Sequence, residues 1–185
     1  MLSDLLFVIR SHIELLEVDM RVVQPDQDLT RLREIIAELR ALPDFDCILL
    51  DCPPSMGLMT KAAMAAADEL LVPLQQGFMM LPALSCLLSQ MQQVIASGVN
   101  PGLHVGGFVI NRYNDDAGQL KEIAHELHAI AQPYMSGNVA YPIAIPESVS
   151  LAEAPGHGLT ILEYDHDGIA ANSFRGIAST ITDCQ

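Results

Sequence analysis

Positive charge is scarce in this sequence. The 185 residues include 9 lysines and arginines against 23 aspartates and glutamates, which gives a formal net charge of −14. Proteins that bind nucleic acid neutralise its phosphates with lysine and arginine. Here only two lysines, Lys61 and Lys121, and seven scattered arginines are available for that purpose. The composition therefore disfavours direct binding to DNA.

Several signals of location and metal binding are missing as well. The four cysteines form no C-x-x-C pair and have no cluster of histidines, which favours free thiols in a reducing compartment over zinc or disulfide sites. No apolar run is long enough to span a bilayer. The amino terminus does not combine a basic with an apolar segment, as a secretory signal would. We therefore expect a cytoplasmic protein that is not inserted in a membrane.

What the sequence does contain is a large apolar fraction. Half of the residues are hydrophobic and 17% are charged, which excludes a disordered chain. The length is sufficient for one domain with a substantial core. We predict a single α/β domain over residues 1–185.

Short apolar runs alternate with segments of helical periodicity. Strands are predicted at Asp46–Asp51, Glu69–Leu74, Leu103–Ile110 and Val139–Ile145, and Leu15–Val23 is compatible with a further strand. Helices are predicted at Leu29–Leu39, Gly57–Ala67, Leu81–Ile95, Leu120–Ile130 and Ala170–Ile181. The first three strands read as buried, whereas prolines place the fourth at a sheet edge. This alternation predicts a mostly parallel sheet flanked by helices.

Asp51 ends the first of these predicted strands. In an open parallel sheet, ligands gather at the carboxyl ends of the strands. A carboxylate in that place can hold Mg²⁺, usually through water, while the metal bridges the phosphates of a nucleotide. An acid after a buried strand also often serves as a turn or helix-cap residue. Spacing alone leaves both roles open.

Three sequence blocks, in order along the chain, give a more specific interpretation. They are DCPPSMGLMT at Asp51–Thr60, AADELLVPLQ at Ala66–Gln75 and IPESVSLAEAPGHG at Ile145–Gly158. The blocks resemble the Walker B and switch segment, the next strand, and the late signature of the ParA, Soj and MinD family of partitioning ATPases, whose Walker A motif is a deviant one. The resemblance covers the chain from about Asp44 to its carboxyl end.

This resemblance implies a function and a set of site residues. Complete members of the family bind ATP with Mg²⁺, dimerise when ATP is bound and dissociate on hydrolysis. By resemblance, Asp51 handles the Mg²⁺ ion through water, and Asn111 and Pro146 lie against the adenine base. The partners implied are a second copy of the chain, a ParA-like relative or an adaptor protein.

The family's phosphate-binding loop is missing from this sequence. That loop is rich in glycine and ends in G-K-[ST], so that backbone amides and lysines surround the phosphates. Neither Lys61 nor Lys121 follows a glycine. We therefore predict a P-loop NTPase-like fold without its first strand and P-loop, inactive by itself. Glu147 and Ser150 stand where relatives carry basic residues that contact DNA, and Gly77 replaces a frequent glutamate.

Two functions are consistent with this pattern. The chain is either a fragment of a partitioning or cargo-positioning ATPase, or a non-catalytic module that binds a full-length relative or an adaptor. The absence of a central strand would expose strand edges and apolar helix faces. Both hypotheses therefore predict a dimer, a partner-bound form or poor solubility.

Overall fold

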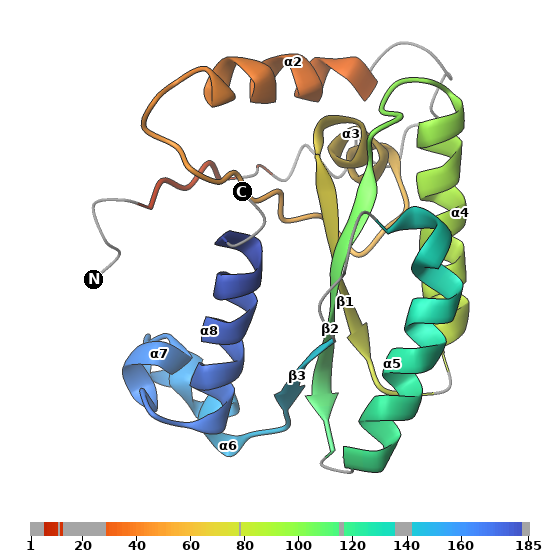
Figure 1. Cartoon of the computed structure of the whole chain (residues 1–185). Helices are drawn as coiled ribbons and strands as arrows, with labels where there is room; N and C mark the ends of the chain where they lie inside the picture. The colour runs from red at the N-terminus through yellow and green to blue at the C-terminus, as the bar shows by residue number, and fades with distance from the viewer. Residues whose placement is uncertain are drawn as a thin grey trace.

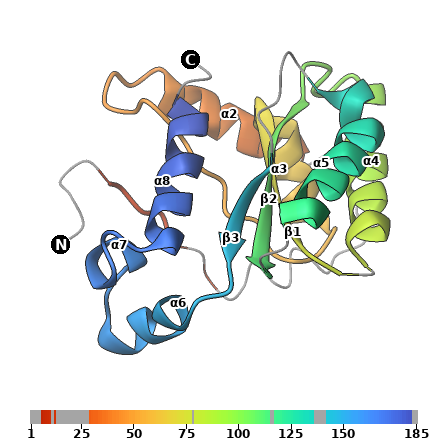
Figure 2. The ribbon, with the colours of Figure 1, turned by 60° about the horizontal axis from the view of Figure 1, so that its bottom comes forward.

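A three-stranded parallel sheet is the centre of the molecule. The computed structural model describes residues 6–10, 12, 29–77, 79–114, 117–135 and 142–182. Within them the strands lie in the order β1-β2-β3, and both neighbouring pairs are parallel. Helices α4 and α5 lie together on one side of the sheet and α8 lies on the other (Figures 1 and 2). The predicted α/β fold with a parallel sheet flanked by helices is confirmed.

The elements follow the predicted alternation closely. In chain order they are α2 (Leu29–Arg40), α3 (Leu58–Ala66), β1 (Glu69–Gln75), α4 (Met80–Ala96), β2 (His104–Tyr113), α5 (Ala117–Ala131), η1 (Gln132–Tyr134), β3 (Ile143–Pro146), α6 (Val149–Glu153), η2 (Ala154–His157), α7 (Ile161–Tyr164) and α8 (Ile169–Thr182). All five predicted helices are present. The short elements η1, α6, η2 and α7 were not predicted, because a helix of one turn has no periodicity to detect. No helix in the described part of the chain has the length and apolar character needed to cross a membrane.

The main core lies between the sheet and helices α4 and α5. Val72 and Leu74 of β1 are buried against this core, whereas Leu71, directly before Val72, keeps 40% of its surface exposed. Leu84 and Met91, seven residues apart on α4, are fully buried in the same cluster. This is the pattern of a strand with alternating faces packed on one stripe of a helix. The prediction of a buried strand thus holds for one face of β1 only.

The central position of β2 explains its more complete burial. Val105, Phe108, Val109 and Ile110 are all buried, as the sequence predicts. Strand β3 forms an edge of the described sheet, which confirms the prediction from its prolines. The Ser173 hydroxyl of α8 donates a 2.9 Å hydrogen bond to the Ala144 carbonyl and holds that helix against β3. The compatible strand at 15–23 and the beginning of the predicted strand at 139–145 lie outside the described residues.

The predicted strand Asp46–Asp51 is wrong. Residues 47–50 have no strand conformation, and Leu49 is 75% exposed. A strand needs a hydrogen-bonded neighbour to satisfy its backbone groups, and no described residue pairs with this segment. The absence of a strand at residues 47–50 leaves β1 with a free edge, because within the described residues β1 pairs with β2 alone. The Phe7 ring contacts Phe45 edge to face, with 5.4 Å between ring centroids, so a second exposed apolar run lies beside this segment.

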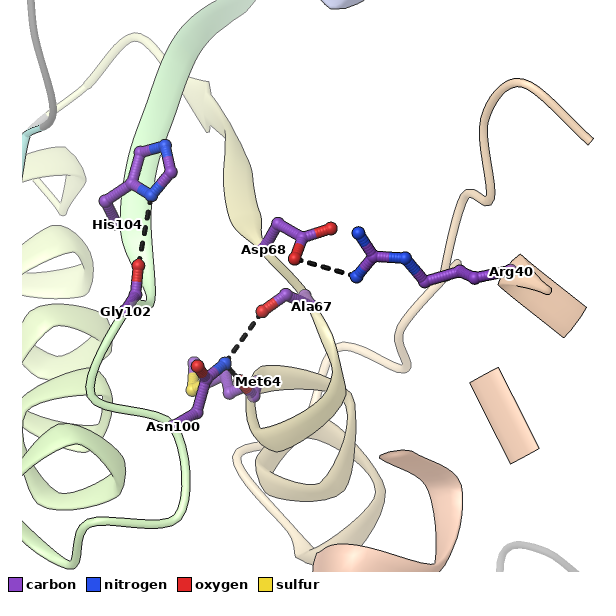
Figure 3. A network of polar contacts seen from close by, with 7 residues as sticks. All are labelled: Arg40, Met64, Ala67, Asp68, Asn100, Gly102 and His104. Atoms are coloured by element: carbon purple, nitrogen blue, oxygen red, sulfur yellow. Dashed lines mark hydrogen bonds and ion pairs between the residues drawn. The ribbon is translucent and has the colours of Figure 1, made fainter. Parts of the chain in front are cut away.

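Polar contacts join α3 to the rest of the fold (Figure 3). The buried Asn100 amide donates hydrogen bonds of 2.9 and 2.7 Å to the carbonyls of Met64 and Ala67. The last carbonyls of a helix have no partner inside the helix, so these bonds satisfy the carboxyl end of α3. Arg40 at the end of α2 forms an exposed 2.9 Å ion pair with Asp68.

Thr160 caps α7 and lowers the pKa of Glu163. The carboxylate accepts 3.0 Å hydrogen bonds from the Thr160 backbone N–H and hydroxyl, and these bonds are the largest of the interactions that lower its pKa from 4.5 to about 2. Because the folded pKa is the lower one, this contribution to stability is present above pH 4.5 and is lost as the pH falls towards 2. Thr160→Val is expected to raise the pKa of Glu163, as an NMR titration of its side chain would measure. An unchanged pKa would contradict the assignment.

Candidate functional site at the carboxyl edge of the sheet

Parallel strands bring their carboxyl ends to one edge of the sheet. Gln75, the last residue of β1, pairs in register with Asn111 of β2. Tyr113, the last residue of β2, pairs with Pro146, the last residue of β3. Two of the three predicted site residues, Asn111 and Pro146, therefore lie on neighbouring strands at the edge where ligands gather in such folds.

Arg112 gives this edge an unusual backbone. Its φ is 53°, and it is the one described residue other than glycine with a positive φ. The register between β2 and β3 breaks between Ile110 and Tyr113, so Asn111 and Arg112 lie outside the β2–β3 ladder. The Arg112 N–H donates a 2.9 Å hydrogen bond to Asn111 Oδ1. The amide carbonyl of Asn111 is thereby fixed, and its amino group can donate to a ligand.

An ion pair joins β2 to the loop after β3. Arg112 Nη2 lies 2.7 Å from Glu147 Oε1, and the Glu147 N–H donates to the Tyr113 carbonyl at 3.2 Å. Both charged side chains are more than half exposed, so the pair contributes at most about 1 kcal/mol to stability. Its effect is geometric, because it holds two chain segments together beside Asn111 and Pro146.

The backbone at Arg112 predicts a reversed order of two substitutions. Alanine is normally more stable than glycine within a strand, but a positive φ costs an L-residue about 1–2 kcal/mol. Arg112→Gly is therefore expected to be more stable than Arg112→Ala by about 1 kcal/mol, measured by urea denaturation. Both variants lose the ion pair, so that loss cancels. The same two substitutions at Lys121, exposed on α5, should give the usual order. The usual order at Arg112 would contradict the positive φ.

The loops after β1 and β2 are also joined. The Asn114 N–H donates a 3.4 Å hydrogen bond to Gln76 Oε1. Gly77, the next residue, has a φ of 150°, which residues with a Cβ rarely adopt. The loop conformation therefore suits glycine at the position where the resemblance leads one to expect a glutamate. Sequence reasoning missed Gln76, Arg112 and the pairing role of Glu147, although Gln76 and Glu147 directly follow β1 and β3 and Arg112 is the penultimate residue of β2.

Asp51, the third predicted site residue, lies in a different setting. It belongs to the irregular segment before α3 and is exposed, so the structure does not place it at the end of a strand. Partial burial raises the pKa of the Cys52 thiol, and the negative charge of Asp51 raises it further. The Thr60 hydroxyl donates a 2.6 Å hydrogen bond to the Ser55 carbonyl and connects the segment to α3. A magnesium-binding role for Asp51 stays a prediction.

Within the ranges that the structure describes, no three or more histidine, cysteine, aspartate or glutamate side chains are grouped as metal ligands. The edge is therefore best described as a set of amide, guanidinium and carboxylate groups around the ends of β2 and β3.

Comparison with known proteins assigns the chain to a family. The AAA_31 family, described as an AAA domain, matches residues 2–105. The chromosome-partitioning ATPase Soj of Treponema pallidum is 34% identical over 176 residues, which cover 95% of this chain and 66% of that protein. The chain belongs to the ParA/Soj/MinD family of partitioning ATPases. The ParA protein of Myxococcus xanthus is 34% identical over 152 residues, 82% of this chain and 51% of that protein.

Solved structures of the ParA/Soj/MinD family share the fold. The cell division ATPase MinD of Pyrococcus furiosus superimposes with a TM-score of 0.57 at 27% identity, over 85% of this chain and 60% of that one. Apo McdA of Cyanthece gives a TM-score of 0.64 over 83% of this chain and 59% of that one, and at 20% identity it shows the fold alone. The chain thus spans about half to two thirds of the length of the family members it matches.

Proposed function

We propose that the chain is a ParA-like chromosome-partitioning, plasmid-partitioning or cargo-positioning ATPase in the form of a P-loop-less fragment, inactive by itself. The observation that carries this proposal is that the chain has the residues proposed to contact the base but not the loop that would bind the phosphates. Asn111 and Pro146, the residues for the base, lie at one edge of the sheet. The 185 residues contain no lysine that follows a glycine, and so no G-K-[ST] loop for the phosphates.

The residues present fit one end of ATP and not the other. The amino group of Asn111 can donate to a base, and Pro146 offers a flat apolar surface next to it on the neighbouring strand. The triphosphate end needs several positive groups and backbone amides. The nearest guanidinium, that of Arg112, already forms an ion pair with Glu147. We therefore derive no hydrolytic step for this chain.

The free edge of β1 supports the proposal that an element of the complete site is supplied from elsewhere. Within the described residues, Glu69–Gln75 pairs on one side alone, and the apolar segment 47–50 has no strand partner. A strand that pairs with β1 in parallel would satisfy the backbone groups of this edge. The partners proposed are therefore a second copy of the chain, a full-length ParA-like relative or an adaptor protein, in the cytoplasm.

DNA binding through the family's usual basic surface is not part of the proposal. Glu147 and Ser150 stand at the positions concerned, and the formal net charge is −14. The ion pair with Arg112 also engages Glu147 within the chain. Repulsion between carboxylates and phosphates opposes such binding, most strongly at low salt.

A non-catalytic interaction module is the second candidate function. The specific observation in its favour is that the structure gives Asp51 no place at the end of a strand. A chain that keeps the sheet, its free edge and the family's dimerising character, but has no phosphate loop, would act by binding a full-length relative or an adaptor.

Titration of a fluorescent ATP analogue with Mg²⁺ into the purified chain tests the proposal. The chain alone is expected to show neither saturable binding nor ATP hydrolysis. Saturable binding that Asp51→Ala weakens by about tenfold or more, or about 1.4 kcal/mol, would overturn the proposed inactivity and establish Asp51 as a site residue. Asp44→Ala removes a neighbouring exposed carboxylate and is the matched control.

Mixing experiments separate the two candidate functions. The chain would be added to a full-length relative such as the Soj protein of Treponema pallidum, and complex formation and ATPase rate would both be measured. One variant of the relative would lack only its own nucleotide-binding edge. If adding the chain restores ATP hydrolysis by that variant, the ATPase-fragment hypothesis is supported. A complex without any change in hydrolysis supports the interaction module.

A further inference from the structure

The side-chain amide of Asn111, at the carboxyl edge of the sheet, has its direction set by the backbone. Its oxygen Oδ1 accepts a 2.9 Å hydrogen bond from the Arg112 N–H. A backbone N–H can only donate, so the amide oxygen must face it and the amino group must face away. Asn111 is exposed, so a ligand can reach this side chain. The next residue in the chain therefore decides which end of the amide a ligand meets.

The conformation of Arg112 makes this hydrogen bond available. The β1–β2 register ends at Asn111, and the β2–β3 register passes from Ile110 to Tyr113. Arg112 is therefore paired in neither ladder. Its φ of 53° belongs to the left-handed region, which is unfavourable for a residue with a Cβ. Such a conformation persists where the surrounding contacts hold it in place.

Glu147 provides two of these contacts. Its carboxylate lies 2.7 Å from Arg112 Nη2 and holds the side chain. Its N–H donates a 3.2 Å hydrogen bond to the carbonyl of Tyr113, the residue after Arg112. Tyr113 also pairs with Pro146, the residue before Glu147. Both the side chain of Arg112 and the backbone that follows it are thus connected to the end of β3.

The other neighbour of β2 restrains the same segment. Gln75 of β1 pairs in register with Asn111. One residue further along, Gln76 Oε1 accepts a 3.4 Å hydrogen bond from the Asn114 N–H. Residues 111–114 are therefore held from both sides, by β1 and its loop and by β3 and its loop.

A fixed amide distinguishes between bases that a freely turning amide would accept. Adenine presents a ring nitrogen that accepts a hydrogen bond beside a 6-amino group that donates one. Asn111 complements this pattern, because its amino group can donate to the ring nitrogen and the second lone pair of Oδ1 can accept from the 6-amino group. Guanine and hypoxanthine carry an accepting oxygen in place of that amino group, which repels the amide oxygen. Turning the amide to avoid this repulsion would bring its amino group against the Arg112 N–H.

We propose that Arg112 and Glu147 are positioning residues that fix the Asn111 amide for adenine and against bases with an oxygen in place of the 6-amino group. Both act through the Arg112 N–H, and neither side chain has to touch the base. The inference rests on the contact between Asn111 and a base that is part of the proposed function. It goes beyond that contact by naming the residues that give the site its choice of base.

Adenosine and inosine are the probes, because neither carries a phosphate for which the chain has no loop. NMR titration of the full chain, followed at the Asn111 side-chain amide, measures both affinities. Adenosine is expected to bind weakly but saturably, and inosine about tenfold more weakly still. Equal binding of the two nucleosides, or no binding of adenosine, overturns the proposal. Either result leaves the proposed inactivity towards ATP in place, whereas saturable binding of the ATP analogue would overturn that inactivity and not the preference for adenosine.

Glu147→Gln tests the positioning role, since it removes the charge that holds Arg112 and keeps the size of the side chain. It is expected to lower the preference for adenosine about threefold, the size of effect that an exposed ion pair has. Hydrogen exchange of the Arg112 N–H, measured without nucleoside, is expected to become faster in the same variant. Glu38→Gln makes the same change at an exposed residue of α2, at the opposite end of the sheet (Figure 1), and should alter neither quantity. An unchanged preference in Glu147→Gln, or equal effects of the two variants, overturns the proposal.

Substitutions at Arg112 separate an effect through the backbone from a direct contact of the guanidinium with the base. Arg112→Gly loses the ion pair but adopts a positive φ without strain. It is therefore expected to keep more of the preference for adenosine than Arg112→Ala, and equal losses in the two variants overturn the proposal. Adding Glu147→Gln to Arg112→Gly is expected to have no further effect, because no guanidinium is left to hold. A further loss in the double variant would show that Glu147 acts by itself and would also overturn the proposal.

Circular dichroism establishes that each variant folds. If Glu147→Gln does not fold, the comparison of Arg112→Gly with Arg112→Ala decides the question, since both variants lack the same ion pair and differ in the backbone conformation that they favour.

Discussion

Replacing Asn100 by aspartate is expected to lower the free energy of unfolding by about 2–4 kcal/mol, because it leaves two buried carbonyls without donors and adds a carboxylate against them. The Asn100 amide is 8% exposed and donates to the carbonyls of both Met64 and Ala67. Aspartate has nearly the same shape, so the change in volume is small. Urea denaturation followed by circular dichroism would measure the loss.

A neighbouring polar contact gives the control for this substitution. Arg40→Ala removes the ion pair with Asp68, whose side chains are 56% and 71% exposed. Exposed pairs of this kind contribute at most about 1 kcal/mol. Both contacts lie in the network of Figure 3 and reach the region where α3 ends. Similar losses for Asn100→Asp and Arg40→Ala would contradict the assignment of Asn100 as the residue that holds the end of α3.

The second large effect is expected on the assembly state. Strand β1 has one edge that no described residue pairs with, and Leu71 on its outer face is 40% exposed. The stretch from Leu70 to Leu74 carries no charge to oppose pairing with another chain. Free, apolar strand edges associate, and natural edges oppose this with charged side chains, especially lysine, and with proline, of which β1 has one, Pro73. The chain is therefore expected to elute as a dimer or larger species, and Leu71→Lys as a monomer of 20.1 kDa.

Light scattering coupled to size-exclusion chromatography would measure both masses. Ile169→Lys places the same charge at a residue that is 75% exposed at the start of α8, away from the free edge. That variant should keep the mass of the unmodified chain. A monodisperse monomer for the unmodified chain would contradict the role assigned to the β1 edge, as would an equal shift in both lysine variants.

The helical segments and two of the strands could be predicted closely from the sequence. The stripe that includes Leu84, Leu88 and Met91 predicts α4, and these three side chains are buried. The apolar run from Leu103 to Ile110 predicts β2, which the structure places at the centre of the described sheet. In both cases the signal is local, because burial of one stripe or of both faces leaves its mark on consecutive residues.

The segment Asp46–Asp51 shows that local sequence signals do not always predict secondary structure correctly. Its composition is that of a buried strand, yet residues 47–50 are not in one. A strand forms only when it pairs with a neighbouring strand, which is often distant in sequence. The composition shows the strand propensity of a segment but not whether such a partner is present. The placement of the three predicted site residues differs for the same reason. Asn111 and Pro146 lie at one edge of the sheet, whereas Asp51 does not end a strand, and the roles of all three residues stay predictions.

By itself, the sequence determined the family, the α/β class, the positions of the main helices and the excess of negative charge. Each of these follows from composition, periodicity or motifs that are local in the chain. Only the tertiary structure decided that β1 has a free edge and that Arg112 adopts a positive φ and pairs with Glu147, 35 residues away. These features depend on which distant segments meet, and contacts between distant segments leave no periodic trace in a single sequence.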